Sequence, residues 1–527
     1  MKESPEKSLT QTLAHPINWK LFDAFVIGSG LGGASAAWAL AQKGYRVAVL
    51  ERGQWPLRDA SDWDSRKILV KSQYASKNPT AVSQYGESAK DVFFNENVGG
   101  MSVFYGGAAF RFRENDFKNW PFSYADLEIY YGQAEDALTV HGANPGNDLC
   151  DSSGPLRSKN YSRTPIPLTG PSRRIFNSAR SLGMHPSAVP LAIRFTGKST
   201  GQAQCIQCLT CDGFPCKIEA KSEACSSFLL SPLSRGVTVI TGIHVDSIDF
   251  SGTHATAING ESKAPIKINL ENRALILAAG ALSSPAILLR SQCEKISNPG
   301  RLDLIGKRLM RHCNAIVAGV FPFRINAQNE FQKQIAVFDF YHQDRASHGL
   351  ATGVIQDIYT PPASAVTALA PLGLKTIGTI LRERIQNLLC IAEDEAREEN
   401  RVELSDRQDS NGILATKITH SYTAADLARR NFLLVKAKRI LRKSGALFFQ
   451  VMRIDSFSHA LGTLCAGNDP KKSVLDGNCK MWGVENLWAL DGSFMPSSAG
   501  VNPSLTIVAN SLRVIEKQFK NIERSIP

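Results

Sequence analysis

The stretch DAFVIGSGLGGASAAWALAQKGYRVAVLERG, residues 23–53, decides the fold class of this chain. It contains a short apolar strand, a glycine-rich turn, a helix that ends at Gly44 and a second apolar strand that ends at Glu51. A strand, a helix and a strand in this order form a βαβ unit, in which the two strands lie parallel. The stretch therefore predicts an α/β fold of the Rossmann type.

The glycine turn carries the pattern G-x-G-x-x-G at Gly28, Gly30 and Gly33, directly after the strand and at the start of the helix. The first glycine permits the tight turn, the second lets the backbone approach a pyrophosphate, and the third lets helix and strand pack closely. The free N–H groups of the helix N-terminus hold phosphates. Glu51 would accept hydrogen bonds from ribose hydroxyls and repel a 2′-phosphate. The turn therefore predicts a dinucleotide site, for FAD or NAD.

The composition of the chain favours a soluble globular protein of two or three domains, because it has 527 residues, of which 43% are hydrophobic and 20% charged. The net charge of +12 comes from Lys and Arg residues that are spread along the chain. We interpret this charge as a solvated surface and expect no nucleic-acid partner. Eleven cysteines without an export signal argue against a disulfide framework.

The polar tail and the lack of long apolar runs indicate a cytoplasmic protein. Residues 1–20 lack the apolar centre of a secretory signal, and no apolar run is long enough to predict a spanning helix. The most apolar segment, residues 363–381, is interrupted by Pro371, Gly373 and Lys375, so we expect it to be buried or to lie at an interface. A peripheral contact with a membrane stays open on this segment.

Three further segments have patterns that predict secondary structure. Residues 120–142 have an N-cap at Ser123 and Asp126 three residues later, which is typical of a helix start. Residues 237–270 alternate with a period of two between Gly and Ser residues, which predicts an antiparallel meander. Residues 273–291 repeat the order of strand, glycine turn and helix.

Several motifs, in this order along the chain, resemble those of the glucose-methanol-choline (GMC) flavin oxidoreductases. They are NVGGMSVFYGGAAFRFRENDF (97–117), LILAAGALSSPAILLRS (275–291) and a long block from HALGTLCAG through GVNPSLTIVANS (459–511). The resemblance covers both ends and the middle of the chain, and it is nearer to the cholesterol-oxidase-like and long-chain-alcohol-oxidase-like bacterial members. It implies FAD as the cofactor, and the block GVNPSLTI argues against an NAD enzyme.

The resemblance also implies how the chain divides. The expected fold is α/β with an α+β second domain: a Rossmann-like FAD-binding domain and a discontinuous substrate-binding domain built on an antiparallel sheet. After the tail, residues 21–314 would form the first part of the FAD-binding domain, with a cysteine-rich loop at 205–225. Residues 315–455, whose texture differs, would form the substrate-binding domain, and residues 456–527 would return to the FAD-binding domain.

The family's flavin contacts carry over to positions of this chain. Gly28, Gly30, Gly33 and Glu51 are expected to hold the ADP half, with Val245 on the adenine side. The contacts expected along the pyrophosphate, the ribityl chain and the flavin are Gly99, Gly100, Ser102, Gly280, Asp491, Gly492, Asn502, Pro503 and Thr506. Tyr105 stands where many members have Asn, and its larger phenol would reshape the edge of the flavin site.

His459 and Asn502 are the catalytic candidates. Oxidation of an alcohol by a flavin needs a base for the hydroxyl proton while the hydride passes to flavin N5, and a neutral imidazole suits the first task. His459, in HALGT, matches the family's histidine, and Asn502, in GVNPSL, matches its second polar residue. The alternatives are a satisfied core histidine and an Asn-Pro turn. His312 matches a family position that is usually structural.

The loop CIQCLTCDGFPC supplies a set of closely spaced cysteines, Cys205, Cys208, Cys211 and Cys216. Ferredoxins hold iron–sulfur clusters with a similar spacing, and four thiolates also hold Zn²⁺. The loop therefore predicts an Fe–S cluster that passes electrons onward from FAD, a zinc site, or a set of reduced cysteines without a metal.

The sequence as a whole predicts an FAD-dependent enzyme that oxidises the CH–OH group of a hydrophobic alcohol or a sugar. His459 is expected to act as the base, and the electrons are expected to pass to an external acceptor such as a quinone or an acceptor protein. The alternatives are an oxygen-using alcohol or sterol oxidase, a hydroxynitrile-type lyase that keeps FAD without redox turnover, and a flavin protein without activity. Residues 315–455, which would line the substrate pocket, show the least resemblance, so the sequence leaves the substrate open.

Overall fold

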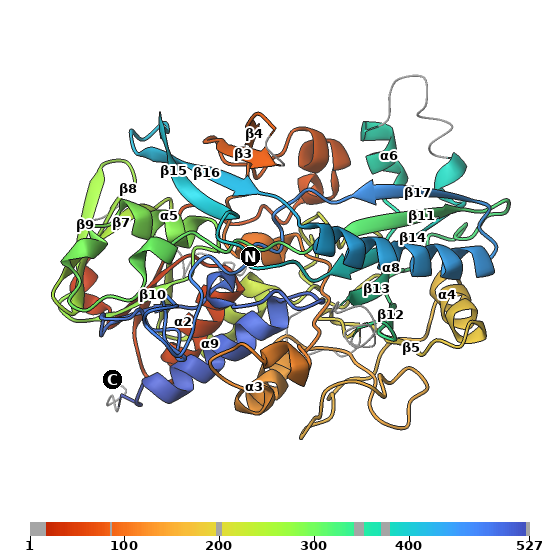
Figure 1. The fold of residues 1–527 in the computed structure, drawn as a ribbon, viewed down its shortest axis with the longest axis horizontal. Helices are drawn as coiled ribbons and strands as arrows, with labels where there is room; N and C mark the ends of the chain where they lie inside the picture. The colour runs from red at the N-terminus through yellow and green to blue at the C-terminus, as the bar shows by residue number, and fades with distance from the viewer. Residues whose placement is uncertain (1–16, 85–86, 196–202, 342–351, 370–379, 523–527) are drawn as a thin grey trace, which may run out of the picture.

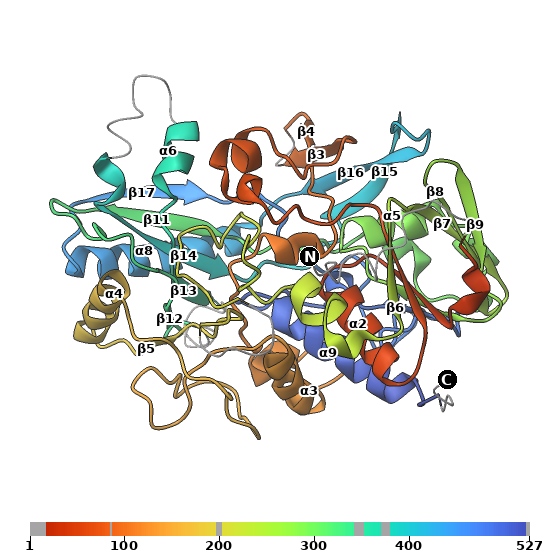
Figure 2. The same cartoon turned by 180° about the vertical axis from the view of Figure 1, so that it is seen from behind.

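The computed structural model describes residues 17–84, 87–195, 203–341, 352–369 and 380–522 of the chain. The described residues form two halves that lie side by side along the longest axis (Figure 1). One half is built on a parallel sheet and the other on a larger antiparallel sheet, and the view from behind shows the same division (Figure 2).

A five-stranded parallel sheet forms the core of the first half, in the order β18–β10–β1–β2–β6. Its strands are β1 (Ala24–Ile27), β2 (Val47–Glu51), β6 (Val237–Thr241), β10 (Ala274–Leu277) and β18 (Leu487–Ala489). All residues of β1 and β2 are buried, as in parallel sheets covered on both faces. α2 (Leu31–Gln42) joins β1 to β2, and α9 (Ser504–Gln518) packs against α2. The predicted βαβ unit and α/β fold class are confirmed.

A six-stranded antiparallel sheet forms the second half, in the order β17–β11–β14–β13–β12–β5. Its strands are β5 (Pro186–Ala188), β11 (Ala315–Val320), β12 (Ile335–Val337), β13 (Gly353–Ile358), β14 (Ile385–Ala392) and β17 (Phe448–Arg453). α4 (Gly170–Ser181) and α8 (Ala424–Lys443) cover one face of the sheet. The opposite face belongs to the main hydrophobic core, which continues into the first half.

The second half contains segments from inside and outside the predicted substrate-binding domain, and the structure does not test the predicted domain boundaries. β11, β12, β13, β14 and β17 fall within residues 315–455, whereas β5 and α4 come from earlier in the chain. The division at residues 315 and 455 therefore stays a prediction.

Two smaller sheets accompany these halves. The first is an antiparallel meander of β7 (His244–Ser251), β8 (His254–Glu261) and β9 (Pro265–Asn269). The second is a mixed sheet of β3 (Thr80–Gln84), β4 (Lys90–Val92), β15 (Arg401–Gln408) and β16 (Leu414–His420). The predicted meander is confirmed from residue 244 onward, but the prediction was wrong for residues 237–241, which form β6. This strand is almost wholly buried, so it fits the interior parallel sheet better than a half-exposed meander.

The predicted helix start at Ser123 is confirmed in α3 (Tyr124–Ala137). The hydroxyl of Ser123 accepts from the N–H of Asp126 at 3.4 Å, and the carboxylate of Asp126 accepts from the N–H of Ser123 at 2.9 Å. These reciprocal bonds form a capping box. The predicted strand, turn and helix at 273–291 are also confirmed, as β10 and α5 (Ser283–Arg290).

The apolar segment 363–381 is described only at its two ends. It begins with α6 (Ala363–Leu369), and residues 370–379 lie outside the described residues. α6 lies against the turn at Arg66–Val70, where the hydroxyls of Ser65 and Ser364 are 2.8 Å apart. Among the helices that the structure describes, none is long and apolar enough to cross a membrane.

Candidate active site

The predicted cofactor contacts gather at one edge of the parallel sheet. Gly28 follows β1, Glu51 ends β2, Gly280 follows β10 and Asp491 follows β18. Because these strands are parallel to one another, their carboxyl ends meet at the same edge. This is the edge at which open α/β sheets bind their ligands.

The glycine loop is shaped by close backbone contacts. Gly28 has a φ of +95°, and a Cβ here would lie 2.4 Å from the carbonyl oxygen of Ala278. A Cβ on Gly33 would lie 2.0 Å from the carbonyl oxygen of Gly28. At Gly30, by contrast, a Cβ would meet nothing within 4 Å, and the N-terminus of α2 has no side-chain cap. Gly30 and the helix N-terminus therefore border open space that suits a pyrophosphate.

Ser29 connects two of the predicted contacts, Glu51 and Gly99, to the glycine loop. Its N–H and its hydroxyl donate to Oε2 of Glu51 at 3.1 and 2.6 Å, and its hydroxyl oxygen accepts from the N–H of Gly99 at 2.9 Å. Burial raises the pKa of Glu51, and the hydrogen bond from Ser29 opposes this rise. A Cβ on Gly100 would lie 3.3 Å from Cα of Gly30. The fold thus brings Glu51, Gly99 and Gly100 to the glycine loop.

Asp491 makes a second junction at the same edge. Its Oδ2 accepts from the N–H of Gly280 at 2.8 Å and from the hydroxyl of Ser284. The carbonyl oxygen of the next residue, Gly492, accepts from the N–H of Gly462 at 3.0 Å, which anchors the His459 loop to this edge. A Cβ on Gly280 would meet nothing within 4 Å, so this turn also borders open space.

The remaining predicted contacts are buried positions: Ser102, Val245, Pro503 and Thr506. The hydroxyl of Thr506, in the first turn of α9, lies 2.8 Å from the hydroxyl of Tyr131 on α3. The phenol of Tyr105 donates to the carbonyl of Ser222, so its orientation is fixed by the segment that follows the cysteine loop.

His459 contacts a second histidine, His312. Their Nδ1 atoms are 3.0 Å apart with the rings at 85°, and Nε2 of His312 lies 2.8 Å from the carbonyl oxygen of Ser498. A carbonyl oxygen only accepts, so Nε2 of a neutral His312 carries the proton and its Nδ1 carries the lone pair. Nδ1 of His459 must then donate, which leaves the lone pair of His459 on Nε2.

Both imidazoles are neutral at neutral pH. Burial, together with the proximity of His312 and Lys333, lowers the pKa of His459 to about 3. His459 is half-buried, so part of its surface stays accessible. Burial also lowers the pKa of His312. A ring that desolvation holds neutral keeps its lone pair available.

Asp394 holds the backbone that presents His312. Its carboxylate accepts from the N–H groups of Arg311 and His312 at 2.8 and 3.1 Å, and from the hydroxyl of Ser498 at 2.7 Å. Burial alone would raise the pKa of Asp394, but His420, 3.7 Å away, and other neighbours lower this pKa below its ordinary value. His312 has a φ of +61°, which is costly for a residue other than glycine. The hydrogen bonds of Asp394 stabilise this conformation.

Asn502 is held by Gln356, which no sequence pattern marked. Nε2 of Gln356 donates to Oδ1 of Asn502 at 3.0 Å, and this leaves the amide N–H groups of Asn502 as donors. Gln356 lies on β13 and is 1% exposed. Its neighbour Val354, two residues earlier on the same face, packs in the main core. Only the pairing of β13 within its sheet brings residue 356 to residue 502, so no local signal was available.

An ion pair between the buried Lys333 and the half-buried Asp212 adjoins this site. Nζ of Lys333 lies 2.6 Å from Oδ1 of Asp212, and the Lys333 side chain is 3% exposed. The charge of Lys333 contributes to the low pKa of His459. Asp212 belongs to the cysteine loop, so this loop reaches the neighbourhood of the catalytic candidates.

The described residues give no support for the predicted metal site at the cysteine loop. Cys205, Cys208, Cys211 and Cys216 are free thiols. In the described ranges, which include all four, no group of three or more His, Cys, Asp or Glu side chains is arranged to hold a metal ion. The loop is organised by Lys221 instead, whose Nζ donates to the carbonyl oxygens of Val103, Cys211 and Phe214 at 2.8, 3.0 and 2.9 Å.

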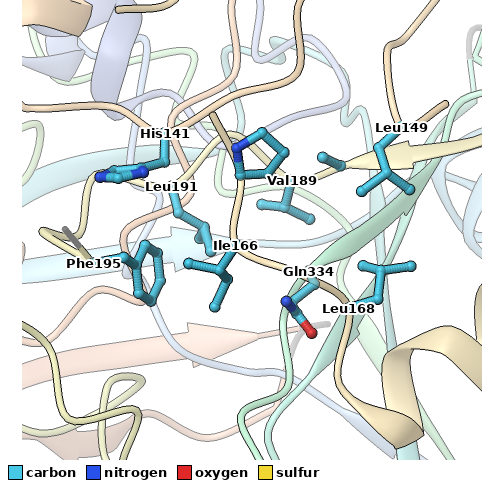
Figure 3. Close-up of a pocket in the computed structure, with 10 residues that line it drawn as sticks. His141, Leu149, Ile166, Leu168, Val189, Leu191, Phe195 and Gln334 are labelled. Atoms are coloured by element: carbon cyan, nitrogen blue, oxygen red, sulfur yellow. The ribbon is translucent and has the colours of Figure 1, made fainter. Parts of the chain in front are cut away.

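A small cavity between other segments is too small to be the substrate site (Figure 3). Its volume is about 10 Å³, which is room for about one water molecule. Most of its lining is apolar, with Leu149, Ile166, Leu168, Val189, Leu191 and Phe195 among the residues. His141 at its border is engaged through Nδ1, 2.8 Å from the carbonyl oxygen of Thr164. The cavity is a packing gap and not a substrate site.

The glycine loop and the sheet edge define a protein of the dinucleotide-binding class. A family profile described as GMC oxidoreductase matches residues 23–314, and a second profile with this description matches residues 396–511. The chain therefore belongs to the GMC oxidoreductase family, whose members bind FAD. The family resemblance of the sequence motifs is confirmed, and the chain is an oxidoreductase.

Relatives are similar over nearly the whole chain. It is 29% identical to 6′′′-hydroxyparomomycin C oxidase of Streptomyces lividus, over 94% of this chain and 90% of the relative. It is 28% identical to paromamine 6′-oxidase of Streptomyces fradiae, over 95% of this chain and 93% of the relative. The solved structure of pyridoxine 4-oxidase from Mesorbium loti is similar with a TM-score of 0.67 at 17% identity, over 94% of this chain and 99% of that one. This last likeness is one of fold.

Proposed function

We propose that the protein oxidises the CH–OH group of a polar, hydroxylated alcohol, with FAD as cofactor, His459 as the base and Asn502 as the group that orients the alcohol oxygen. The observation that carries the proposal is the 3.0 Å contact between the Nδ1 atoms of His459 and His312, because it leaves the lone pair of His459 on Nε2. A neutral imidazole with a free lone pair can accept the hydroxyl proton.

The residues at the sheet edge suit FAD. The open space at Gly30 and Gly280 and the uncapped N-terminus of α2 match a pyrophosphate, and Glu51 at the end of β2 matches a ribose. When bound, FAD supplies the ring that accepts the hydride from the alcohol carbon. We assign the cofactor contacts to Gly28, Gly30, Gly33, Glu51, Gly99, Gly100, Ser102, Val245, Gly280, Asp491, Gly492, Pro503 and Thr506.

His459 and Asn502 act on the same substrate hydroxyl, His459 on its proton and Asn502 on its oxygen. The substrate hydroxyl donates to Nε2 of His459, and its oxygen accepts from the amide N–H of Asn502, because Oδ1 of Asn502 is already occupied by Gln356. Negative charge grows on the oxygen as the proton moves to Nε2, and the N–H of Asn502 stabilises this charge. The positive charge that forms on His459 strengthens the hydrogen bond from its Nδ1 to His312.

Polar groups near the catalytic pair favour a hydroxylated substrate over a wholly apolar one. Oδ2 of Asp212 and Oε1 of Gln356 are buried and have no hydrogen-bond partner within the part of the chain that the structure describes. An unpaired buried acceptor costs about 1–3 kcal/mol, and substrate hydroxyls would remove this cost. The name of the Streptomyces lividus relative, an oxidase of a 6′′′-hydroxy compound, is consistent with oxidation of a hydroxyl group.

Anaerobic mixing of the FAD-loaded protein with sugars, polyols, long-chain alcohols and sterols tests the proposal. We expect polar hydroxylated alcohols alone to remove the visible absorbance of the oxidised flavin. His459→Gln should keep bound FAD but slow flavin reduction about 10²–10⁴-fold, whereas His254→Gln, on the remote β7–β9 meander, should leave the rate unchanged. Substrate turnover without loss of colour would indicate a lyase, and a normal rate in His459→Gln would exclude His459 as the base.

A further inference from the structure

A second, strongly polar cavity lies outside the proposed active site. Its volume is about 260 Å³, and it lies between the β3–β4 pair, the first half of α8 and the end of β17. Its lining consists of Gln84, Glu87, Lys90, Asn314, Tyr422, Arg430, Arg453, Ile454 and Asp455. Only Ile454 is apolar. Neither His459 nor Asn502 belongs to this lining, so we treat this Arg430 cavity as separate from the site of oxidation.

The Arg430 cavity has a buried floor and an exposed rim. Asn314, Tyr422 and Arg430 are buried and form the floor. Glu87, Lys90, Arg453 and Asp455 are exposed and form the rim. A ligand that enters past the rim would be desolvated where it contacts the floor. Its polar groups would need hydrogen-bond partners from the protein there.

Arg430 is a buried cation without a counterion. The residue is 7% exposed, and its guanidinium has one hydrogen-bond partner among the described residues, Oδ1 of the neighbouring Asn431 at 3.4 Å. Its Nε has no partner, and no carboxylate of the described residues lies within 4 Å of its guanidinium. Burying an unpaired charge is costly, so an arginine in this state is expected to serve a ligand.

The other groups of the cavity do not neutralise Arg430. Of the two rim carboxylates, Glu87 pairs with Lys90 at 3.7 Å and Asp455 pairs with Arg311 at 3.7 Å. Arg453 has no carboxylate partner within the described ranges, so it adds a second uncompensated cation. The cavity therefore carries excess positive charge from two arginines, one at its floor and one at its rim.

Asn314 adds a neutral polar group to the floor. It is 8% exposed, and its Oδ1 is buried without a hydrogen-bond partner among the described residues. An amide oxygen in this state accepts from a donor such as a hydroxyl. The floor thus combines a cation for an oxyanion with an acceptor for a hydroxyl group.

We propose that the Arg430 cavity binds a small oxyanion, a carboxylate or a phosphate, and favours one that also carries a hydroxyl group. The oxyanion accepts from the guanidinium groups of Arg430 and Arg453, in the charge-assisted geometry that arginine offers to carboxylates and phosphates. A hydroxyl on the ligand donates to Oδ1 of Asn314. The proposal is independent of the reaction assigned to His459.

Calorimetry and thermal unfolding of the FAD-loaded protein with inorganic phosphate, malate and succinate test this site. We expect phosphate and malate to bind with one site per chain and to raise the unfolding temperature, and we expect succinate, which lacks the hydroxyl, to bind more weakly than malate. Arg430→Gln should weaken binding at least tenfold. Arg439→Gln, at an exposed position of α8, is the matched control and should bind as the natural protein does.

The stability of the variant without added anion distinguishes a ligand-binding arginine from a structural one. Because Arg430→Gln removes an unpaired buried charge, its unfolding temperature without anion should be equal to or above that of the natural protein. If the unfolding temperature of Arg430→Gln is lower, anion binding is measured in the exposed Arg453→Gln variant instead. An unchanged anion affinity of Arg453→Gln then overturns the proposal. It is also overturned if no anion binds at tens of millimolar concentration, or if Arg430→Gln binds as tightly as Arg439→Gln.

Discussion

Replacement of His312 by leucine tests whether His312 selects the tautomer of His459 that has its lone pair on Nε2. The change keeps the size of the side chain roughly constant but removes the Nδ1 acceptor that faces His459 at 3.0 Å and the Nε2 donor that faces Ser498 at 2.8 Å. Nδ1 of His459 then has no acceptor at this position, and the proton is no longer held there. The population of the tautomer with its lone pair on Nε2 falls.

The size of the effect follows from the hydrogen bond that selects the tautomer. The net contribution of one such bond is about 0.5–1.5 kcal/mol, which corresponds to a roughly 2- to 13-fold loss of the reactive tautomer. Flavin reduction in His312→Leu should slow by this factor while FAD remains bound. His312→Asn places an amide oxygen near the position of Nδ1, so it should recover most of the rate.

The dependence on pH shows whether a slower rate comes from the tautomer of His459 or from its protonation. With a pKa of about 3, His459 is deprotonated throughout the neutral range, so the rate of flavin reduction should not fall between roughly pH 8 and pH 5. Burial is the largest cause of that low pKa, and it remains in His312→Leu. Because this variant also loses the neutral acceptor that would stabilise a protonated His459, the pKa of His459 should stay low and the profile should stay flat over the same range.

Rapid mixing under anaerobic conditions, followed by the loss of flavin absorbance, measures these rates, and the FAD content and the unfolding temperature control for folding. The reasoning would be refuted if His312→Leu kept the natural rate. Equal rates in His312→Leu and His312→Asn would also refute it, because the two variants differ in the acceptor that they offer to His459.

Three further changes separate the roles of other residues. Gly30→Ala should fold normally yet bind FAD at least tenfold more weakly, because its Cβ enters open space next to the helix N-terminus. Gly33→Ala should destabilise the fold itself, because its Cβ would lie 2.0 Å from a backbone oxygen. FAD titration and thermal unfolding measure the difference. Asp212→Asn should lower the free energy of unfolding by about 1–3 kcal/mol in chemical denaturation, because it leaves the buried charge of Lys333 without its counterion. No loss would show that the pair is not formed. Lys221→Met should loosen the cysteine loop, because three carbonyl oxygens lose their donor, and thiol labelling of Cys211 should become faster; an unchanged labelling rate would contradict this role of Lys221.

Several features could be predicted because neighbouring residues determine them. The strand, glycine turn, helix and second strand of residues 23–53 follow from local periodicity and from the backbone freedom of Gly28. The capping box at Ser123 and Asp126 is likewise a contact between residues three apart. The family motifs also predicted one feature that is not local. They assigned the glycine turns after β1 and β10 and the residues after β18 to one cofactor site, although these segments are far apart in the sequence.

One prediction was wrong, and another found no support, where the competing choice depended on distant partners. Residues 237–241 alternate as a meander strand would, but they pair with β2 instead of β7, because the edge of the parallel sheet buries both of their faces. The spacing of Cys205, Cys208, Cys211 and Cys216 suits a metal in an isolated loop. In the folded chain Lys221 binds the loop carbonyls instead.

The sequence by itself determined the class of the fold, the dinucleotide site at the end of β1 and the candidacy of His459 and Asn502, since each depends on a short motif. The tertiary structure alone decided what holds these two residues. His312 lies 147 residues from His459, and Gln356 lies 146 residues from Asn502. Contacts over such separations are fixed by the pairing of strands and the packing of the two halves, which no local pattern records, and they determine which nitrogen of His459 carries the lone pair.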